Sequence, residues 1–284
     1  MTEPTAATTA APAPAPAPAP NIVDFDHVTK RFGSVTVIRD VTFSVRDLPN
    51  KGEFIAILGP SGCGKSTVLR LIAGLRPHHP PSEGRVLVGG RPVGPPGSDR
   101  SMVFQDYTSF DNRTVQDNVA FGLECRGVPA KERRERAREW IAKVGLDVAR
   151  DAHKYPSELS GGMRQRVAIA RTLILSPRII LMDEPFGALD PTTRLHMQAL
   201  LVDLWKEAQA TVFFVTHSIE EAVYLGDRVY VFSSAPGTIL REMEVPPPDR
   251  PPKDMQREPA FVERVFEIRD LIDRLAASTR AGDD

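Results

Sequence analysis

A glycine-rich segment from Gly59 to Ser66 has the spacing of a phosphate-binding loop. It reads Gly-Pro-Ser-Gly-Cys-Gly-Lys-Ser, and it stands between an apolar run at 54–58 and an apolar helix predicted at 66–75. Glycines let successive backbone N–H groups point at phosphate oxygens, and the start of the helix adds the positive end of its dipole. We expect Lys65 to reach the β- and γ-phosphates of a nucleotide and the Ser66 hydroxyl to bind Mg²⁺.

The candidate phosphate-binding residues are consecutive in the chain. Cys63 lies inside the loop, where it is interpreted as a small filler rather than a nucleophile. The full candidate set is Gly59, Pro60, Ser61, Gly62, Cys63, Gly64, Lys65, Ser66 and Thr67.

Two adjacent carboxylates, Asp183 and Glu184, follow the apolar run 179–182. Alone, this pattern is typical of the turn at the end of a strand. Open α/β sheets, however, place ligand groups at the carboxyl ends of their strands, in the same crevice as a phosphate loop. We therefore expect Asp183 to hold Mg²⁺ through water, and Glu184 to orient or deprotonate the water that attacks the γ-phosphorus.

The elements that must position these groups are short apolar runs. Two β-rich runs, 35–45 and 54–58, precede the loop. Later runs are typical of strands buried on both faces of a largely parallel sheet: 85–88, 102–104, 179–182, 212–215 and 229–232. Helical patterns replace strands between about 106 and 170. The pattern predicts an α/β core with an inserted helical subdomain.

Composition narrows the class of partner. The 284 residues suggest one large domain or two small ones, and 36 Lys and Arg against 37 Asp and Glu give a net charge of −1. A nucleic-acid partner is not expected, because duplex-binding proteins usually carry a basic excess. Two cysteines and the absence of a secretory leader or a membrane-length apolar run favour a cytoplasmic location.

Proline-rich segments bound the central unit. An Ala-Pro alternation within residues 1–20 predicts an extended, disordered tail, and 246–257 predicts a linker, which leaves 21–245 as the main domain. The charge-dense run 131–139 is interpreted as a solvated helix face. Apolar residues at helical spacing predict one amphipathic helix within 258–284; they are Phe261, Val265, Ile268, Ile272 and Leu275.

One segment narrows the class of phosphate-loop protein. Leu159 to Gln165 (LSGGMRQ) resembles the signature sequence of the ATP-binding cassette (ABC) ATPases, and it stands between the loop and the acidic run, as in that family. The resemblance covers about 23–245. It includes Gln105 of the Q-loop, the Ala-Leu-Asp of the D-loop that ends at Asp190, and the switch histidine His217.

The resemblance implies a fold and a shared site. The fold is a P-loop NTPase (RecA-like) core with an antiparallel β subdomain and an inserted α-helical signalling subdomain. Two cassettes, two copies of this chain or this chain and a paralogue, sandwich two ATP molecules head to tail. The signature residues of one cassette then bind the γ-phosphate held by the other; here they are Ser160, Gly161 and Gly162.

Other positions take their roles from the same resemblance. His217 contacts the γ-phosphate, Gln105 reaches Mg²⁺ and the attacking water, and Asp190 couples the two sites. Phe32 matches the aromatic residue that stacks on adenine, although a lone Phe near a strand end is also typical of a core position. The catalytic candidates are thus Glu184, His217 and Gln105.

A cassette without membrane spans resembles the energy-supplying subunit of a bacterial importer. This implies a separate permease, a periplasmic or extracellular solute-binding protein, and a peripheral place on the cytoplasmic face of the inner membrane. The amino-acid sequence at 176–190 and 235–239 is most similar to the nitrate, sulfonate and taurine branch of these importers. Two segments depart from that branch: 106–113, where the family docks its permease, and 46–51, which carries extra residues.

A soluble mechanochemical clamp for DNA repair, chromosome organisation or translation is the alternative. Such relatives usually carry long coiled coils, zinc modules or a second cassette. This sequence has no heptads, no Cys-x-x-Cys and one phosphate loop, so the importer interpretation is favoured.

Overall fold

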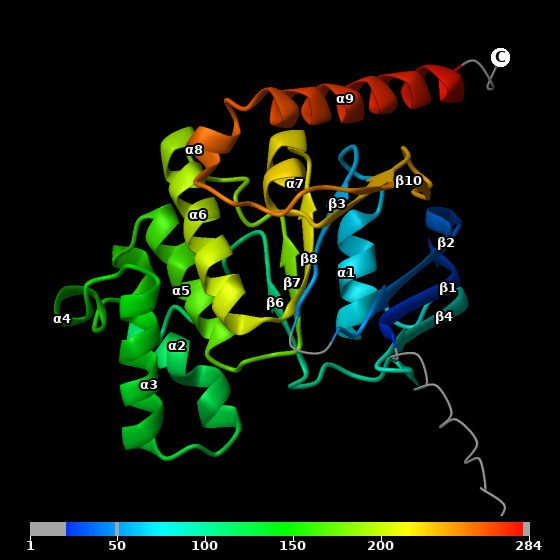
Figure 1. Ribbon diagram of the computed structural model, residues 1–284. Coiled ribbons are helices and arrows are strands. Elements are labelled where there is room, and N and C mark those ends of the chain that lie inside the picture. The colour runs from blue at the N-terminus through cyan, green and yellow to red at the C-terminus, as the bar shows by residue number, and fades with distance from the viewer. Residues whose placement is uncertain (1–20, 49–50, 281–284) are drawn as a thin grey trace, which may run out of the picture.

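The computed structural model describes the backbone of residues 21–48 and 51–280 and the side chains as far as 274 (Figure 1). The tail predicted at 1–20 lies outside these residues. The strands are β1 (Asn21–Phe32), β2 (Val35–Arg46), β3 (Phe54–Leu58), β4 (Glu83–Val88), β5 (Arg91–Pro92), β6 (Arg100–Val103), β7 (Ile179–Asp183), β8 (Thr211–Thr216), β9 (Arg228–Phe232) and β10 (Ile239–Glu244). The helices are α1 (Lys65–Ala73), α2 (Val115–Cys125), α3 (Ala130–Lys143), α4 (Val148–Asp151), the 3₁₀ turn η1 (Pro156–Glu158), α5 (Gly161–Leu173), α6 (Pro191–Ala208), α7 (Ile219–Leu225), α8 (Pro252–Met255) and α9 (Pro259–Arg280).

A six-stranded sheet in the order β10-β9-β3-β8-β7-β6 forms the centre of the molecule. Its strands are parallel except β10, which runs antiparallel to β9. Alternate residues of β3 enter opposite clusters: Phe54 and Leu58 pack in one, Ile55 and Ile57 in the other. Both faces are therefore buried, which explains the continuous apolar runs and confirms the predicted α/β class.

A second, four-stranded antiparallel sheet has the order β2-β1-β4-β5. The prediction that 85–88 belongs to the parallel sheet is wrong, because β4 pairs antiparallel with β1. Of the residues in β4 only Val86 is fully buried, while Glu83, Gly84 and Arg85 are exposed. A run of four residues is too short for its composition alone to reveal which sheet it joins.

Helices cover the two faces of the central sheet unequally. Helix α1 and the antiparallel sheet pack on one face, while α5, α6, α7 and α9 share the cluster on the other (Figure 1). Residues 104–178 hold α2 to α5 and no strand, and α5 continues to Leu173, past the predicted limit at 170.

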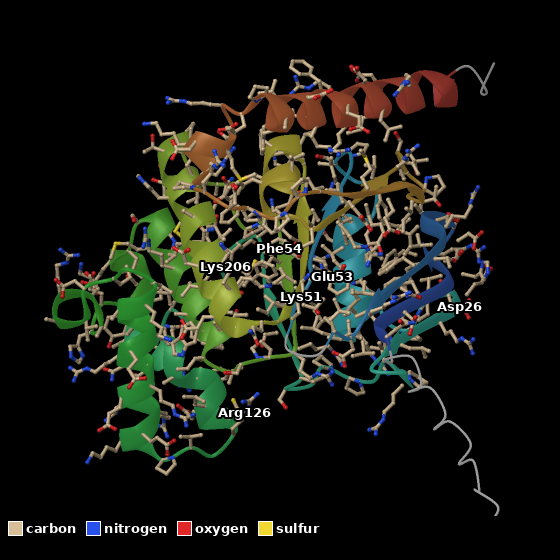
Figure 2. The ribbon with its side chains drawn as sticks, viewed as in Figure 1. Asp26, Lys51, Glu53, Phe54, Arg126 and Lys206 are labelled. Carbon is tan, nitrogen blue, oxygen red and sulfur yellow. The ribbon has the colours of Figure 1, made fainter. Side chains whose placement is uncertain are left out.

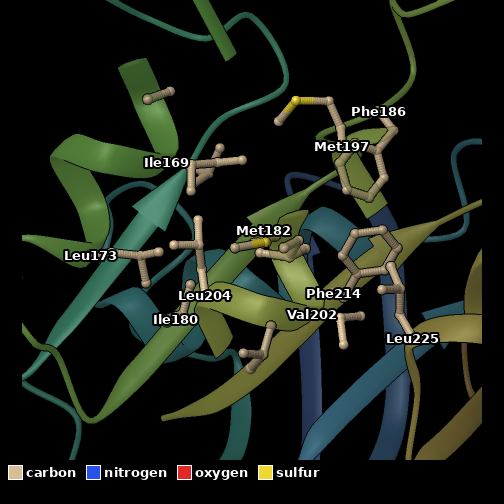
Figure 3. Packing of buried hydrophobic residues seen from close by; sticks show 14 of the residues in the cluster. Ile169, Leu173, Ile180, Met182, Phe186, Met197, Val202, Leu204, Phe214 and Leu225 are labelled. Carbon is tan, nitrogen blue, oxygen red and sulfur yellow. The ribbon is translucent and has the colours of Figure 1, made fainter. Parts of the chain in front are cut away.

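Close packing joins the helices to the sheet. Figure 3 shows Ile169 and Leu173 of α5 beside Ile180 of β7, all members of one cluster. In the same view the rings of Phe186 and Phe214 lie near each other, with their centroids 5.6 Å apart. The helical region is thus continuous with the core of the sheet.

Polar contacts at the lower end of the helical region in Figure 2 add a second attachment. There the guanidinium of Arg126, at the C-terminal end of α2, donates to the carbonyl oxygens of Leu175 (3.0 Å) and Ser98 (3.1 Å). These bonds connect α2 to the segments that precede β7 and β6. The attachment is exposed, so it orients α2 more than it stabilises the fold.

Beyond β10 the chain crosses back over the sheet. The short helix α8 lies inside the predicted linker, and α9 extends along the top of the molecule in Figure 1. Phe261, Val265 and Ile268 of the predicted stripe are buried, and Ile272 packs against their cluster. The side chain of Leu275 lies outside those described.

In the described part of the chain, every helix is too short or too polar to cross a membrane.

The phosphate loop is supported from behind by the segment that follows β9. The backbone of Gly237 bonds to β2 through its N–H to the oxygen of Val37 and through its oxygen to the N–H of Arg39, both 2.9 Å. A Cβ added at Gly237 would lie 1.9 Å from the carbonyl oxygen of Cys63. Only a residue without a side chain allows this close approach to the loop.

We predict that Gly237→Ala will destabilise the protein by about 2 kcal/mol or more, because backbone on both sides must move to admit the methyl group. Nucleotide affinity should fall with it, since the displaced atom belongs to the phosphate loop. Thermal unfolding and nucleotide titration measure the two effects. Gly94→Ala is the matched control, because a Cβ there meets nothing within 4 Å; equal stability of the two variants would contradict the prediction.

Candidate active site

The phosphate loop occupies the turn between β3 and α1. The buried strand β3 ends at Leu58, and α1 begins at Lys65 after Gly64, which has a φ of 96°. That left-handed conformation favours glycine, and a Cβ at Gly64 would also meet Ile38 Cγ2 at 2.4 Å. The loop therefore closes tightly on the first turn of α1, whose N–H groups have the orientation that binds phosphate.

Lys65 is buried against its own loop. Its ammonium donates to the carbonyl oxygens of Gly59 (2.8 Å) and Pro60 (2.9 Å). An ammonium has three N–H donors, so among the described residues one donor is left for a phosphate oxygen. The next residues, Ser66 and Thr67, continue the helix, and Thr67 is buried with its N–H bonded to the oxygen of Gly64.

A hydrogen bond joins the phosphate loop to the acidic strand. The Ser66 hydroxyl donates to Asp183 Oδ1 at 2.7 Å, and Arg70 Nη2 lies 3.6 Å from Asp183 Oδ2. The Asp183 side chain is only 3% exposed. Burial raises the pKa of Asp183 above its usual value, while the Ser66 bond and the charge of Arg70 oppose the rise. Sequence reasoning missed Arg70, because its pairing depends on the neighbouring strand.

Glu184 and His217 lie together where β7 and β8 end. His217 Nδ1 is 3.4 Å from Glu184 Oε2, and the two side chains are 56% and 20% exposed. Glu184 has a φ of 46°, which is rare for a residue with a side chain, and its N–H bonds to the oxygen of Val215. This left-handed conformation ends the extended backbone of β7 at Glu184. Strained backbone of this kind clusters at functional sites.

Gln105 follows β6, the strand next to β7, and its side chain is exposed. The segment after it is fixed by Tyr107, whose buried hydroxyl donates to the carbonyl oxygen of Pro185 at 2.8 Å. The Gln105 segment is thereby attached to the turn that carries Glu184. Nothing in the sequence marks Tyr107, because its burial depends on contact with the distant turn after β7.

The signature residues and Asp190 form a second group at two helix N-termini. Ser160 is exposed and caps α5, its hydroxyl oxygen accepting from the N–H of Met163. Asp190 caps α6, with Oδ1 accepting from the N–H groups of Thr192 and Thr193. Hydrogen bonds from Thr193 hold the pKa of Asp190 below its usual value.

The two helix starts touch each other. Gly162 packs against α6, because a Cβ there would lie 3.1 Å from Thr193 Cγ2. Gly161 has open space at its own Cβ position. In Figure 1 the helices α1 and α5 lie on opposite sides of the strands. The structure thus assembles one group around Lys65 and Asp183 and another around Ser160 and Asp190.

Phe32 ends β1 and is half-buried. Its ring lies edge-on to His78, with centroids 5.1 Å apart, and Lys30 Nζ lies 5.1 Å from its centroid. It belongs to neither core cluster, which argues against the core alternative.

Comparison with known proteins identifies the family. The sequence model of the family described as "ABC transporter" matches residues 38–187, more than half of the chain. The nitrate import ATP-binding protein NrtD of Synechocystis is 46% identical over 246 residues, which cover 84% of this chain and 89% of that protein. The taurine import ATP-binding protein TauB of Rhizobium johnstonii is 51% identical over 199 residues, covering 70% and 74%.

Solved structures show the same fold. The ATP-binding cassette MJ0796, in a dimeric post-hydrolysis state bound to ADP and Pi, has a TM-score of 0.67 and 34% identity; the match covers 79% of this chain and 99% of that one. A second structure, cbiO1 of Clostridium perfringens, described as part of an ABC transporter complex, has a TM-score of 0.68 and 25% identity, covering 93% and 100%. This chain belongs to the ABC transporter family, and it is an ATP-binding cassette that hydrolyses ATP.

Proposed function

We propose that this cassette is the ATP-hydrolysing subunit of an importer, and that it works as a head-to-tail dimer on a separate membrane permease, at the cytoplasmic face of the membrane. A solute-binding protein outside the membrane would deliver the solute. The named import proteins NrtD and TauB support this assignment. They also support a small anionic or zwitterionic solute of the nitrate, sulfonate or taurine kind. The Ser66–Asp183 bond carries the ATP-hydrolysing part of the proposal, because it unites the phosphate loop and the acidic strand in one site.

The residues present fit a magnesium ion bound with ATP. A hydroxyl and a buried carboxylate within 2.7 Å of each other offer the oxygen ligands that Mg²⁺ prefers, Ser66 directly and Asp183 through water. Gln105 is exposed at the end of the adjacent strand and completes the candidate set. When bound, the ion neutralises charge that develops on the phosphate oxygens.

The remaining steps, nucleotide binding and activation of water, are carried out by side chains and backbone groups of the cassette. Lys65 and the N–H groups at the start of α1 bind the β- and γ-phosphates. Glu184 accepts or orients the proton of the attacking water, and His217 is close enough to hold the carboxylate and contact the γ-phosphate. Phe32 stacks on adenine, while Ser160, Gly161 and Gly162 of a second copy cover the same γ-phosphate.

A groove between the core and the helical region is the proposed permease-binding surface. It has a volume of about 370 Å³ and includes Phe104, Phe110, Phe121, Arg171 and Leu175 among its lining residues. The rings of Phe110 and Phe121 are 4.4 Å apart, and Phe110 is 37% exposed. Exposed aromatic pairs in a groove are typical binding anchors. Part of the divergent segment 106–113 forms one wall.

We predict that Glu184→Gln will lower the rate of MgATP hydrolysis by about 100-fold or more, because the amide cannot take a proton from water. Nucleotide affinity should stay within about twofold of the unchanged protein, since the side chain keeps its size. Steady-state hydrolysis and equilibrium nucleotide binding measure the two quantities. Unchanged turnover would remove Glu184 from the role of base.

We predict that Ser160→Arg will abolish hydrolysis while Lys65 still binds nucleotide, because a large cation at the start of α5 crowds the γ-phosphate held by the other copy. Hydrolysis and nucleotide binding are measured on the same preparation. Ser157→Arg, an exposed substitution three residues earlier, is the control and should behave normally. Normal hydrolysis by the Ser160 variant would refute the shared site.

We predict that Phe110→Asp will reduce the amount of permease that copurifies with a tagged chain from solubilised membranes by about tenfold, since a charge replaces an apolar anchor. Hydrolysis by the isolated cassette should be unaffected. Phe266→Asp on α9 is the matched control, because Phe266 is 52% exposed and lies away from the groove. Undiminished copurification with Phe110→Asp would place the permease on another surface.

A further inference from the structure

Glu221 is a buried carboxylate to which the mechanism above gives no role. It lies in the first turn of α7, and its side chain is 8% exposed. Its Oε2 accepts a hydrogen bond of 2.5 Å from the hydroxyl of Thr216, the residue that immediately precedes His217. Burial raises the pKa of Glu221, and the Thr216 bond and the charge of Arg194 oppose that rise. Capping of α7 does not explain this buried carboxylate, because Ser218 already caps the helix.

The other oxygen of Glu221 faces α6. Arg194 Nε lies 3.7 Å from Oε1, and Arg194 Nη2 donates to the carbonyl oxygen of Leu189 at 3.0 Å. Leu189 immediately precedes Asp190. Gln198 Nε2 also donates to Oε1, at 3.4 Å. Glu221 therefore connects the neighbour of His217 on one side with the neighbour of Asp190 on the other.

This connection is incompletely bonded. Arg194 Nε and Gln198 Oε1 are both buried, and neither has a hydrogen-bond partner among the described residues. Buried polar atoms without partners are rare and unfavourable. A movement of Arg194 by about 1 Å toward Glu221 would turn the 3.7 Å contact into a charge-assisted hydrogen bond of ~2.8 Å. The network thus has a second, better-bonded arrangement within reach.

We propose that Glu221 is a positioning residue for ATP hydrolysis, which transmits a displacement of the turn that carries Asp190 through Arg194 to Thr216 and His217. The positioning role rests on the proposed function, because it requires a second copy of the cassette to contact Asp190. Closure of that copy shifts the turn and draws Arg194 onto Glu221. The Glu221–Thr216 bond then fixes the end of β8 with His217 beside Glu184. The packed helices α6 and α7 and the partly buried Arg194–Glu221 pair provide the contacts through which such coupling would pass.

The test compares Glu221→Gln with Glu220→Gln in the full-length protein. The Glu221 variant keeps the size of the side chain and an oxygen that accepts from Thr216, but it removes the charge that attracts Arg194. We expect kcat to fall about tenfold or more and the Hill coefficient for ATP to fall toward 1, with nucleotide affinity within twofold. Glu220 is the half-exposed neighbour on the same helix, paired with Arg269, and its variant should match the unchanged protein.

A double-mutant cycle with Arg194→Gln separates coupling from simple loss of structure. If the pair acts as a unit, the double variant is no slower than either single variant, and the effects are strongly non-additive. A merely structural role would instead lower the melting temperature and the number of nucleotide sites, and leave the Hill coefficient of the remaining sites unchanged.

The outcomes distinguish this proposal from the function on which it rests. Loss of hydrolysis in Ser160→Arg together with normal kcat and cooperativity in Glu221→Gln overturns the positioning role and leaves the shared site intact. Additive effects in the cycle also overturn it. Normal hydrolysis in Ser160→Arg would show that hydrolysis does not need the second copy, and this result would overturn both proposals. Reduced kcat, reduced cooperativity and non-additivity together support the positioning role of Glu221.

Discussion

The hydrogen bond between Ser66 and Asp183 joins two segments that are 117 residues apart in the sequence, and the remainder of the site is arranged around it. It forms because the strands that precede both segments end at the same edge of the sheet. Leu58 of β3 is opposite Thr216 of β8, and Asp183 of β7 is opposite Val215. The three strand ends are therefore level to within one residue, and each delivers its next side chains to one crevice.

Because both faces of the central sheet are buried, its polar groups gather at the ends of the strands. Alternate residues of the four inner strands, β9, β3, β8 and β7, enter one apolar cluster or the other, so charged groups have room only where these strands begin or end. Asp183 stands at such an end, the last residue of β7, but it is buried, and it has both a hydroxyl and a guanidinium as partners. A paired carboxylate at this depth is tolerable, whereas an isolated one would neutralise itself by taking up a proton.

The sequence predicted five of the six central strands, because each of these five contains a continuous apolar run; 54–58 and 229–232 fall within one residue of the strands found. It did not predict β10, whose apolar residues are interrupted by Arg241, Glu242 and Glu244. It placed 85–88 in the wrong sheet, since pairing partners are set by distant residues. Arg70 and Tyr107 could not be identified for the same reason. Glu220 and Glu221 are adjacent residues of the same type, and packing against α6 buries only Glu221, while the Glu220 side chain stays 43% exposed.

The second group of residues is positioned by capping rather than by strands. Ser160 and Asp190 each occupy the N-cap of a helix, where their side chains satisfy the first N–H groups of that helix. The start of α5 contacts the start of α6, because Gly162 packs against Thr193. In the proposed dimer, a shift at the start of α5 would therefore press on the start of α6, which carries Asp190. From there the path through Arg194 and Glu221 leads to the end of β8 that holds His217. Under the proposal, one chain contains both ends of this connection, and the ligand that acts on the Ser160 end is bound by another copy.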